Sequence, residues 1–328
     1  FLIVSKEHFD LDYLGSNGIK ITPEVKDNEA NVHIETFTNT KDAQVRVQIK
    51  DQDGKVVAEG DGCDVNLNIP NPIRWHGRKN PYLYTAAATL TVNGEVKDEI
   101  TNRFGIRTFS VDPKKGFFLN GEHYPLHGVS RHQDFKALGN AISTKNHDED
   151  MDMICELGAN TIRLAHYQHD QYFYDLCDER GMVVWAEIPY ITMHMTKGNA
   201  NTQSQMEELV VQNYNHPSIV CWGLSNEITA ASAVDEDLIE NHRKLNDLCH
   251  RLDATRPTTM ADVFMLETDS PLLEIPDINS YNLYFGWYVG DLEQNDEFFD
   301  EYHAKFPNRC IGLSEYGADA NPQYQSLA

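Results

Sequence analysis

The sequence predicts a multidomain β plus α/β chain, with an immunoglobulin-like β-sandwich over residues 18–110 followed by a (β/α)8 TIM barrel over residues 111–328. In the first segment apolar and polar residues alternate, which is typical of half-buried strands. In the second segment short apolar runs alternate with amphipathic stretches, which is typical of β/α units. Hydrophobic residues make up 41% of the 328 residues and charged residues 24%, so most of the chain is expected to be globular.

The first domain is divided by hairpin signals. The alternation is clear in Val32–Phe37 and in Val45–Ile49. Asp53-Gly54 and Asn93-Gly94 lie between such runs, and these dipeptides supply the positive φ angles that tight hairpins require. We therefore expect an antiparallel sandwich of about 90 residues, with residues 1–17 forming a linker or the tail of a preceding domain.

The second domain contains seven apolar runs at the spacing of β/α units. The runs are residues 125–129, 161–164, 182–185, 219–224, 258–261, 278–280 and 310–313. Between them lie helices with one apolar face, such as the helix that carries Met151, Ile154 and Leu157. Because the sequence has no glycine-rich dinucleotide or phosphate loop, a barrel fits better than an open nucleotide-binding sheet. An eighth strand and its helix would need more chain, so we expect the barrel to be incomplete at Ala328.

Charge and composition exclude several classes of partner. The chain has 27 Lys and Arg against 51 Asp and Glu, a net charge of −24, which argues against nucleic acid as the main partner. No run approaches the roughly 18 apolar residues of a membrane span. The six cysteines form no CxxC pair. The N-terminus has no signal-peptide pattern, so a cytoplasmic and a periplasmic location both remain open, and so does homo-oligomerisation.

The candidate site lies where the strands end, because side chains at the carboxyl ends of barrel strands face the active site. Glu227 follows the fourth apolar run and Glu315 the seventh, so the two carboxylates are expected across the barrel mouth from each other. Glycoside hydrolysis uses such a pair, one carboxyl group to protonate the leaving oxygen and the other to attack or to activate water. Other strand ends add groups that can hydrogen-bond hydroxyls or stack on a sugar: His132, Asp134, Arg163, His166, Glu187, Asn226, Tyr284 and Trp287.

These motifs, taken in order, resemble glycoside hydrolase family 2 over nearly the whole chain. Each motif alone is modest, but their ordered conjunction is specific. The matching blocks are Gly128–His132, Asn160–Tyr167, Asn226-Glu227, Tyr284–Tyr288 and Ser314–Gly317 in the barrel, and Asn80–Tyr84 and Arg103–Arg107 in the sandwich. The resemblance implies that a jelly-roll domain precedes the sandwich.

The resemblance also implies roles for the matching residues. Glu227 would be the general acid/base and Glu315 the nucleophile that forms a glycosyl-enzyme. Asn226 would hold the sugar 2-hydroxyl, while Tyr284 and Arg163 would stabilise the nucleophile. His132 and His166 would contact the sugar, and Glu187 would be a supporting carboxylate. A retaining mechanism follows, with the two carboxyl groups expected about 5–5.5 Å apart.

No cofactor and no metal are expected. Galactosidases of the family carry a magnesium site that uses a Glu and a His shortly after strand 3. In the stretch Glu187–His194 the His remains, as His194, but that Glu is absent. A different class of protein, a metal-dependent hydrolase built on His132, His166 and His169, is the alternative that this expectation sets aside.

The expected substrate is a carbohydrate, a terminal β-D-galactoside cleaved by an exo-acting enzyme. The loop at residues 130–139 looks like the galactosidase version, and the net charge of −24 disfavours an anionic glucuronide. A β-glucuronidase of the same family is the runner-up, since the loops that hold the glucuronide carboxylate in that family would lie beyond Ala328. A carbohydrate-binding relic without turnover is the third alternative.

Overall fold

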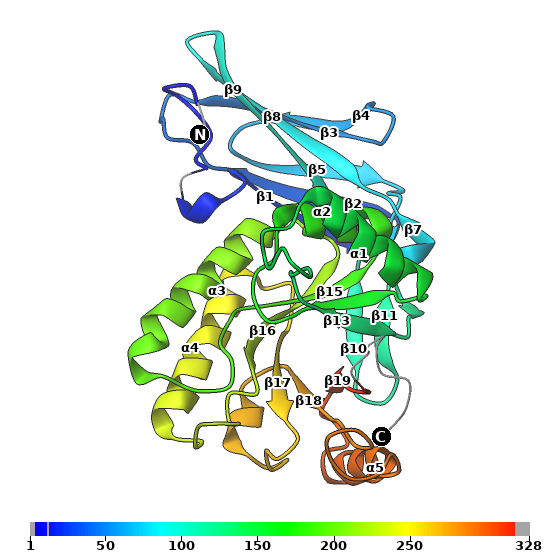
Figure 1. The fold of residues 1–328 in the computed structure, drawn as a ribbon. Helices are drawn as coiled ribbons and strands as arrows, with labels where there is room; N and C mark the ends of the chain where they lie inside the picture. Colours follow the sequence, from blue (N-terminus) through cyan, green and yellow to red (C-terminus); the bar gives the residue numbers. More distant parts are fainter. Residues whose placement is uncertain (1–3, 12, 319–328) are drawn as a thin grey trace.

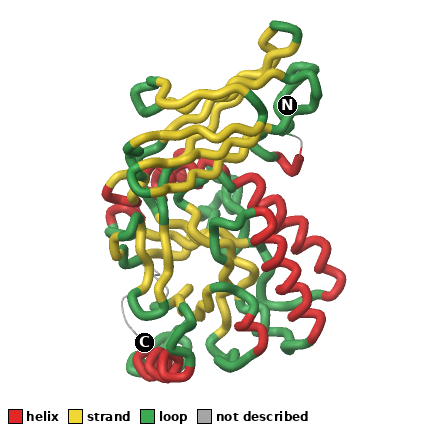
Figure 2. Tube along the Cα trace, turned by 180° about the vertical axis from the view of Figure 1, so that it is seen from behind, coloured by secondary structure: helices red, strands yellow, loops and turns green. Residues whose placement is uncertain are grey.

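The computed structural model describes residues 4–11 and 13–318, and it places a β-sandwich on one end of a parallel β/α barrel (Figure 1). Residues 1–3 and 12 of the expected N-terminal tail, and residues 319–328 of the expected barrel segment, lie outside the described residues. Seen from behind, the sandwich strands again lie above the barrel strands, and the helices lie around the outside of the barrel (Figure 2). The predicted fold class, a β-sandwich followed by an incomplete barrel, is confirmed. No helix among the described residues is both long and apolar enough to cross a membrane.

The sandwich is built from two antiparallel sheets. One has the order β1-β2-β5 and the other β4-β3-β8-β9. The strands are β1 (Ile19–Lys26), β2 (Glu29–Thr36), β3 (Gln44–Lys50), β4 (Val56–Asp61), β5 (Asp64–Pro70), β8 (Tyr84–Val92) and β9 (Glu95–Phe104).

The sandwich strands form where the sequence alternates. Along β8 every second residue is buried, so one face of the strand packs into the core and the other faces outward. Asn93 and Gly94 both have positive φ angles, 54° and 82°, and they turn the chain from β8 into β9. The side chain of Phe9, from the segment before β1, is fully buried in this core.

Short elements connect the two domains. They are η1 (Tyr13–Gly15), β6 (Trp75–His76), η2 (Gly77–Lys79), β7 (Asn80–Pro81) and the small sheet of β10 (Phe109–Asp112), β11 (Gly116–Leu119) and β12 (Glu122–His123). Trp75 is fully buried at the junction, and its indole N–H donates to the carbonyl oxygen of Asp178 in the barrel at 2.9 Å. The junction is therefore packed and hydrogen-bonded.

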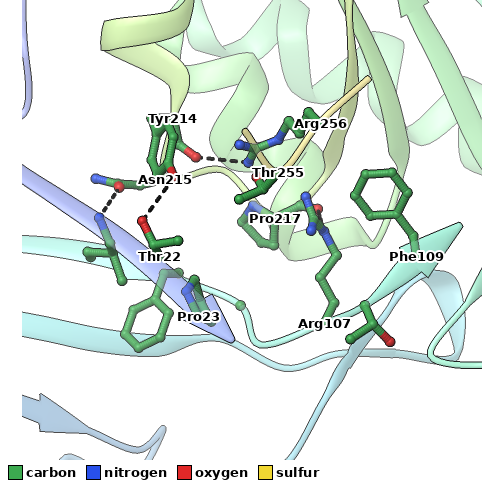
Figure 3. Close-up of a pocket in the computed structure, with 13 residues that line it drawn as sticks. Thr22, Pro23, Arg107, Phe109, Tyr214, Asn215, Pro217, Thr255 and Arg256 are labelled. Atoms are coloured by element: carbon green, nitrogen blue, oxygen red, sulfur yellow. Dashed lines mark hydrogen bonds between the residues drawn. The ribbon is translucent and has the colours of Figure 1, made fainter. Parts of the chain in front are cut away.

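A cavity of about 190 Å³ also lies at this junction (Figure 3). Arg107 lines it from the sandwich side and Arg256 from the barrel side. Arg107 donates to the carbonyl oxygens of Pro217 and Ile219, at 2.5 and 2.7 Å. Arg256 donates to Asp253 and to backbone carbonyl oxygens. Arg107 thus ties the sandwich side of the junction to the barrel, whereas the partners of Arg256 all lie within the barrel segment.

The barrel sheet has seven parallel strands in chain order, joined mainly by helices. Its strands are β13 (Gly128–Arg131), β14 (Thr161–Leu164), β15 (Val183–Glu187), β16 (Ile219–Asn226), β17 (Thr258–Val263), β18 (Ile278–Asn282) and β19 (Ile311–Glu315). Its helices are α1 (Thr144–Glu156), α2 (Gln171–Arg180), η3 (Thr196–Gly198), α3 (Asn199–Asn213), α4 (Glu236–Leu252), η4 (Pro271–Glu274) and α5 (Gln294–Lys305). The sheet curls until its first and last strands approach, and Ser130 Oγ donates to the carbonyl oxygen of Ser314 at 3.5 Å.

Three local expectations for the barrel were wrong. The first strand begins at Gly128 and not at Pro125, because the Asn160 side chain takes the place of a strand partner, accepting from His127 N and donating to Pro125 O. Leu157 is 75% exposed, since α1 ends at Glu156 and Leu157 no longer belongs to its apolar face. A helix with one apolar face was expected between β17 and β18, but the only helix described there is the short η4.

Candidate active site

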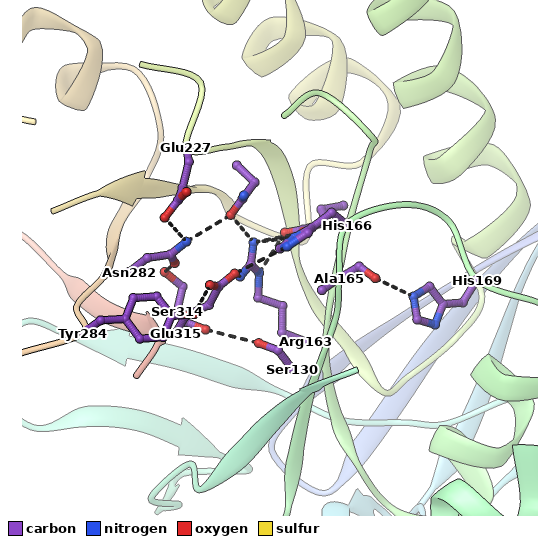
Figure 4. A network of polar contacts seen from close by, with 12 residues as sticks. Ser130, Arg163, Ala165, His166, His169, Glu227, Asn282, Tyr284, Ser314 and Glu315 are labelled. Carbon is purple, nitrogen blue, oxygen red and sulfur yellow. Dashed lines mark hydrogen bonds and ion pairs between the residues drawn. The ribbon is translucent and has the colours of Figure 1, made fainter. Parts of the chain in front are cut away.

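Most of the predicted site residues meet at the carboxyl ends of the barrel strands (Figure 4). Their side chains form one network of hydrogen bonds and ion pairs. It joins Arg163 on β14, Glu187 on β15, Asn226 on β16, Glu227 directly after β16, Asn282 on β18, Glu315 on β19 and, from loops, His166 and Tyr284.

Arg163 lies at the centre of this network. Its guanidinium group donates twice to Glu187, at 2.9 and 3.0 Å, and once to Glu315. Nη2 also donates to Asn226 Oδ1 at 2.8 Å. Burial alone would lower the pKa of Arg163, but Glu187 and Glu315 more than offset it, so the pKa is raised. Arg163 is therefore a permanent cation held between two carboxylates.

Glu315 accepts hydrogen bonds from two side chains and lies near a third. Besides Arg163, the phenol of Tyr284 donates to Glu315 Oε2, and His166 Nε2 lies 3.6 Å from Oε1. Burial, and then the hydrogen bond to Glu315, raise the pKa of Tyr284, so the phenol keeps its proton and remains a donor at neutral pH. Glu315 is therefore held by an arginine cation and a phenol donor, with a histidine ring nearby.

A register shift between β18 and β19 determines the position of Glu315. Tyr281 pairs with Leu313, but the next residue, Asn282, pairs with Glu315, so Ser314 is an extra residue on β19. Such bulges bend a strand and redirect the side chains that follow. This bulge sets Glu315 beside Asn282 in the sheet.

Glu227 is held by an unusual backbone conformation. Its φ angle is +45°, in the left-handed region that side chains other than glycine rarely adopt. Its N–H donates to the carbonyl oxygen of Ala261 at 2.7 Å, and Asn282 Nδ2 donates to its Oε1 at 3.0 Å. The register of β16 against β17 also shifts just before it, between Gly223 and Asn226. Strain of this kind concentrates at functional sites.

The histidines fall into two groups. His166 Nδ1 lies 2.7 Å from Glu187 Oε1, and the His132 ring packs edge-on at 5.1 Å from the His166 ring. Burial, and then His166, lower the pKa of His132. His169 faces elsewhere: its nitrogens lie beside Ala165 O and Arg131 Nη1, and burial lowers its pKa to about 3.

This arrangement gives no support to a metal site on His132, His166 and His169. Within the described residues, the group with metal-ligand spacing is instead Asp175, Asp178 and His216. That group lies at the junction of the domains, where Arg103 pairs with Asp175 and His216 Nδ1 lies 2.6 Å from Asp178. It is an ion-pair cluster apart from the candidate site.

Asp134 and Trp287 do not join the network. Both are exposed, in the loops after β13 and β18. Asp134 acts on His132 through its charge. The Trp287 ring lies 6.0 Å from Tyr288, whose ring lies 5.0 Å from Tyr284. Both residues therefore belong to the rim of the site.

Asn282 and Ser314 are site residues that the sequence analysis missed. Asn282 is fully buried and contacts Asn226, Glu227 and Ser314. It ends the sixth barrel strand, two residues before Tyr284. The rule that strand ends face the site could have found it.

Glu227 directly follows the fourth strand of the barrel sheet and Glu315 ends the seventh, and glycoside hydrolysis uses a pair of carboxylates of this kind. The chain belongs to glycoside hydrolase family 2. The model described as "Glycosyl hydrolases family 2, TIM barrel domain" matches residues 111–327, and the model "Glycosyl hydrolases family 2" matches residues 16–107. The predicted resemblance to this family is thereby confirmed.

Several similar proteins are named β-glucuronidases. A β-glucuronidase of Bacteroides fragilis is 37% identical over 96% of this chain and 48% of that protein. The crystal structure of an FMN-binding β-glucuronidase from Facaelibacterium prausnitzii L2-6 is 44% identical, with a TM-score of 0.94 over 98% of this chain and 51% of that one. That of a putative β-galactosidase from Bacteroides fragilis is 33% identical, also with a TM-score of 0.94, over 99% of this chain and 50% of that one. The chain thus spans about half the length of these relatives.

Proposed function

We propose that the chain forms the central and catalytic part of a retaining β-glucuronidase. The observation that carries the proposal is the unequal setting of the two carboxylates: Glu315 is held by Arg163 and Tyr284, whereas Glu227 accepts a hydrogen bond from the neutral Asn282. The carboxylate that faces a cation and a phenol is assigned to attack, and the carboxylate that faces a neutral amide is assigned to proton transfer.

In the proposed first step, a Glu315 oxygen attacks the anomeric carbon while Glu227 gives its proton to the glycosidic oxygen that leaves. The covalent bond neutralises Glu315, and Glu227 is left ionised. In the second step Glu227 takes a proton from water as the water attacks the same carbon, which frees Glu315 and restores Glu227. The two reaction steps change no oxidation state, so they need no flavin.

The remaining residues have proposed binding roles. His166 Nδ1 lies 2.7 Å from Glu187 Oε1 and 3.2 Å from Arg163 Nη2, so the ring is held from that side and Nε2 is assigned to contact a sugar hydroxyl. His132, Asp134 and Trp287 lie toward the rim, where a second part of the substrate would pass. Arg163 and Glu187 bind each other and act by positioning Glu315, Asn226 and His166.

The glucuronide assignment reverses the sequence-based preference for a galactoside. It is supported by the relatives that carry the name β-glucuronidase, at 37% and 44% identity. The net charge of −24 does not decide between the two substrates, because that charge belongs to the whole surface, whereas a substrate carboxylate responds to the few groups around it. A β-galactosidase remains the second candidate, favoured by the neighbour named putative β-galactosidase at 33% identity.

The test compares kcat/KM for 4-nitrophenyl β-D-glucuronide and β-D-galactoside on the complete natural polypeptide that contains these residues. We expect the glucuronide to be preferred by about 100-fold or more, and the first-formed sugar to be the β-anomer by NMR. Glu315→Gln should abolish turnover of the preferred substrate, which shows that the activity belongs to this site.

Other results would select among the alternatives. A preference for the galactoside would favour the second candidate. Cleavage of a β-mannoside alone would reject both substrates, and binding of sugars without hydrolysis would point to a carbohydrate-binding relic. A first-formed α-anomer would end the double-displacement account.

A further inference from the structure

Asn282 lies between the two carboxylates of the candidate site (Figure 4). Its backbone pairs with Glu315 across β18 and β19, and its side chain reaches Glu227. No part of Asn282 is exposed to solvent, so its amide depends entirely on internal partners.

The amide of Asn282 has its hydrogen-bonding groups occupied. Nδ2 donates to Glu227 Oε1 at 3.0 Å and to Asn226 Oδ1 at 3.2 Å. Oδ1 accepts from Ser314 Oγ at 2.7 Å. An amide nitrogen has two hydrogens to give, and both are used here. Turning the amide over would set its oxygen against two acceptor oxygens, so the partners fix its orientation.

This orientation distinguishes the two oxygens of Glu227. Oε1 accepts from Asn282, so a proton on Glu227 is placed on Oε2, the oxygen that Asn282 does not contact. When Glu227 is ionised, the same N–H supports the anion without adding a charge. Asn282 can therefore serve the acid and the base form of Glu227 in turn.

The orientation of Asn226 follows from the same contact. Asn226 Oδ1 accepts from Asn282 Nδ2 and from Arg163 Nη2, at 3.2 and 2.8 Å. With two donors on the oxygen, the NH2 group must point the other way. Asn226 is thereby set to act as a donor toward a sugar hydroxyl.

We propose that Asn282 is a positioning residue that selects Glu227 Oε2 as the proton-transferring oxygen and turns the Asn226 amide so that it donates to the substrate. Ser314 holds Asn282 in place by occupying its oxygen. This inference rests on the proposed function, because it assigns Asn282 its part in the acid/base step.

The test is Asn282→Asp in the complete natural polypeptide, assayed over pH with an activated aryl glycoside and with an unactivated alkyl glycoside of the preferred sugar. A carboxylate at position 282 keeps the acceptor for Ser314 but repels the ionised form of Glu227, which then holds its proton to higher pH. We expect the alkaline limb of kcat/KM to move up by about one pH unit or more. Because the introduced carboxylate offers no N–H to Glu227 Oε1, the proton of Glu227 is no longer confined to Oε2, so we expect kcat/KM at pH 7 to fall by about 100-fold for the alkyl glycoside and far less for the aryl glycoside.

Asn279→Asp is the matched control. Asn279 lies on the same strand and is also buried, but its amide donates to Tyr302 of α5 and not to the site. It adds the same charge to β18, and we expect the pH limb to stay in place. If Asn282→Asp does not fold, Ser314→Ala tests the same proposal. We then expect kcat/KM to fall by about threefold to tenfold, and only for substrates with poor leaving groups.

The outcomes separate this inference from the proposed function. If Glu227→Ala abolishes hydrolysis of the alkyl glycoside while Asn282→Asp leaves the pH limb and the leaving-group dependence unchanged, the role of Asn282 is refuted and the proposed function stands. An equal loss on both substrates, with no shift of the limb, would mark Asn282 as merely structural and would also refute it. If the wild-type protein cleaves no glycoside, both fail.

Discussion

Glu187 accepts two hydrogen bonds from Arg163, of 2.9 and 3.0 Å, and none of the Glu187 side chain is exposed. The fork of the guanidinium group is thus fixed from one side, and a third nitrogen is left to point at Glu315. Glu187 therefore acts on Glu315 through Arg163, without touching it.

Glu187→Gln should weaken both the fold and the site. The substitution leaves Arg163 buried with Glu315 as its remaining carboxylate, and breaking a buried ion pair in this way typically lowers the free energy of unfolding by about 3 kcal/mol. Denaturant unfolding measures this loss. Glu240→Gln, which breaks the exposed pair with Lys244, is the control and should change stability little. Similar losses of stability in the two variants would contradict the prediction that the buried ion pair contributes more than the exposed one.

Tyr284→Phe should lower kcat by about 100-fold, because it removes a donor to Glu315 in a half-buried setting. Burial and Glu315 raise the pKa of Tyr284, so the wild-type phenol stays protonated at neutral pH and should add no limb there to the pH profile. The measurement is kcat on an aryl glycoside between pH 5 and pH 8. Tyr302→Phe also removes a buried phenol, one that accepts from Asn279 away from the site, and should leave kcat near the wild-type value.

Glu227→Ala should show a loss that depends on the leaving group. An alkyl glycoside needs its leaving oxygen protonated, so kcat/KM should fall by about 100-fold to 10,000-fold. An activated aryl glycoside does not need that proton and should lose far less in the first step. Azide enters the space left by the carboxylate, and the product expected from it is a β-glycosyl azide, detectable by NMR. A uniform loss on all substrates would remove the acid role from Glu227.

Asp262→Asn should change how stability depends on pH. Asp262 is buried on β17, its Oδ2 has no hydrogen-bond partner among the described residues, and burial raises its pKa to about 8. The unfolded chain ionises this carboxyl group near pH 4, whereas the folded chain keeps it protonated. Its contribution is therefore fully present below about pH 4 and is lost as the pH rises toward 8, with a slope of up to about 1.4 kcal/mol per pH unit.

Unfolding by urea at pH 5 and pH 7.5 tests this prediction. In Asp262→Asn the difference between the two free energies of unfolding should be smaller than in the wild type. An unchanged difference would mean that Asp262 is ionised in the folded protein.

Much of the fold could be predicted because local rules decide it. The turn at Asn93-Gly94 and the alternation along β8 follow from residue types and their spacing. The start of β13 could not be placed in the same way, because the Asn160 side chain, more than 30 residues away, takes the partner groups of Pro125 and His127.

The site was predictable where a residue carries its own chemistry. Glu227 and Glu315 stand at strand ends as carboxylates, and glycoside hydrolysis uses such a pair. Asn282 is a neutral residue with no such signature. The extra residue at Ser314 sets Asn282 beside Glu315, and no sequence pattern announces this register shift between two strands.

The left-handed backbone at Glu227 places the proposed acid/base in a conformation that costs folding stability. Glycine adopts this backbone conformation without strain, so Glu227→Gly should raise the free energy of unfolding by about 1 kcal/mol while removing the proposed acid. Selection for stability and selection for activity therefore favour different residues at position 227. Comparing Glu227→Gly with Glu227→Ala would measure the size of each effect.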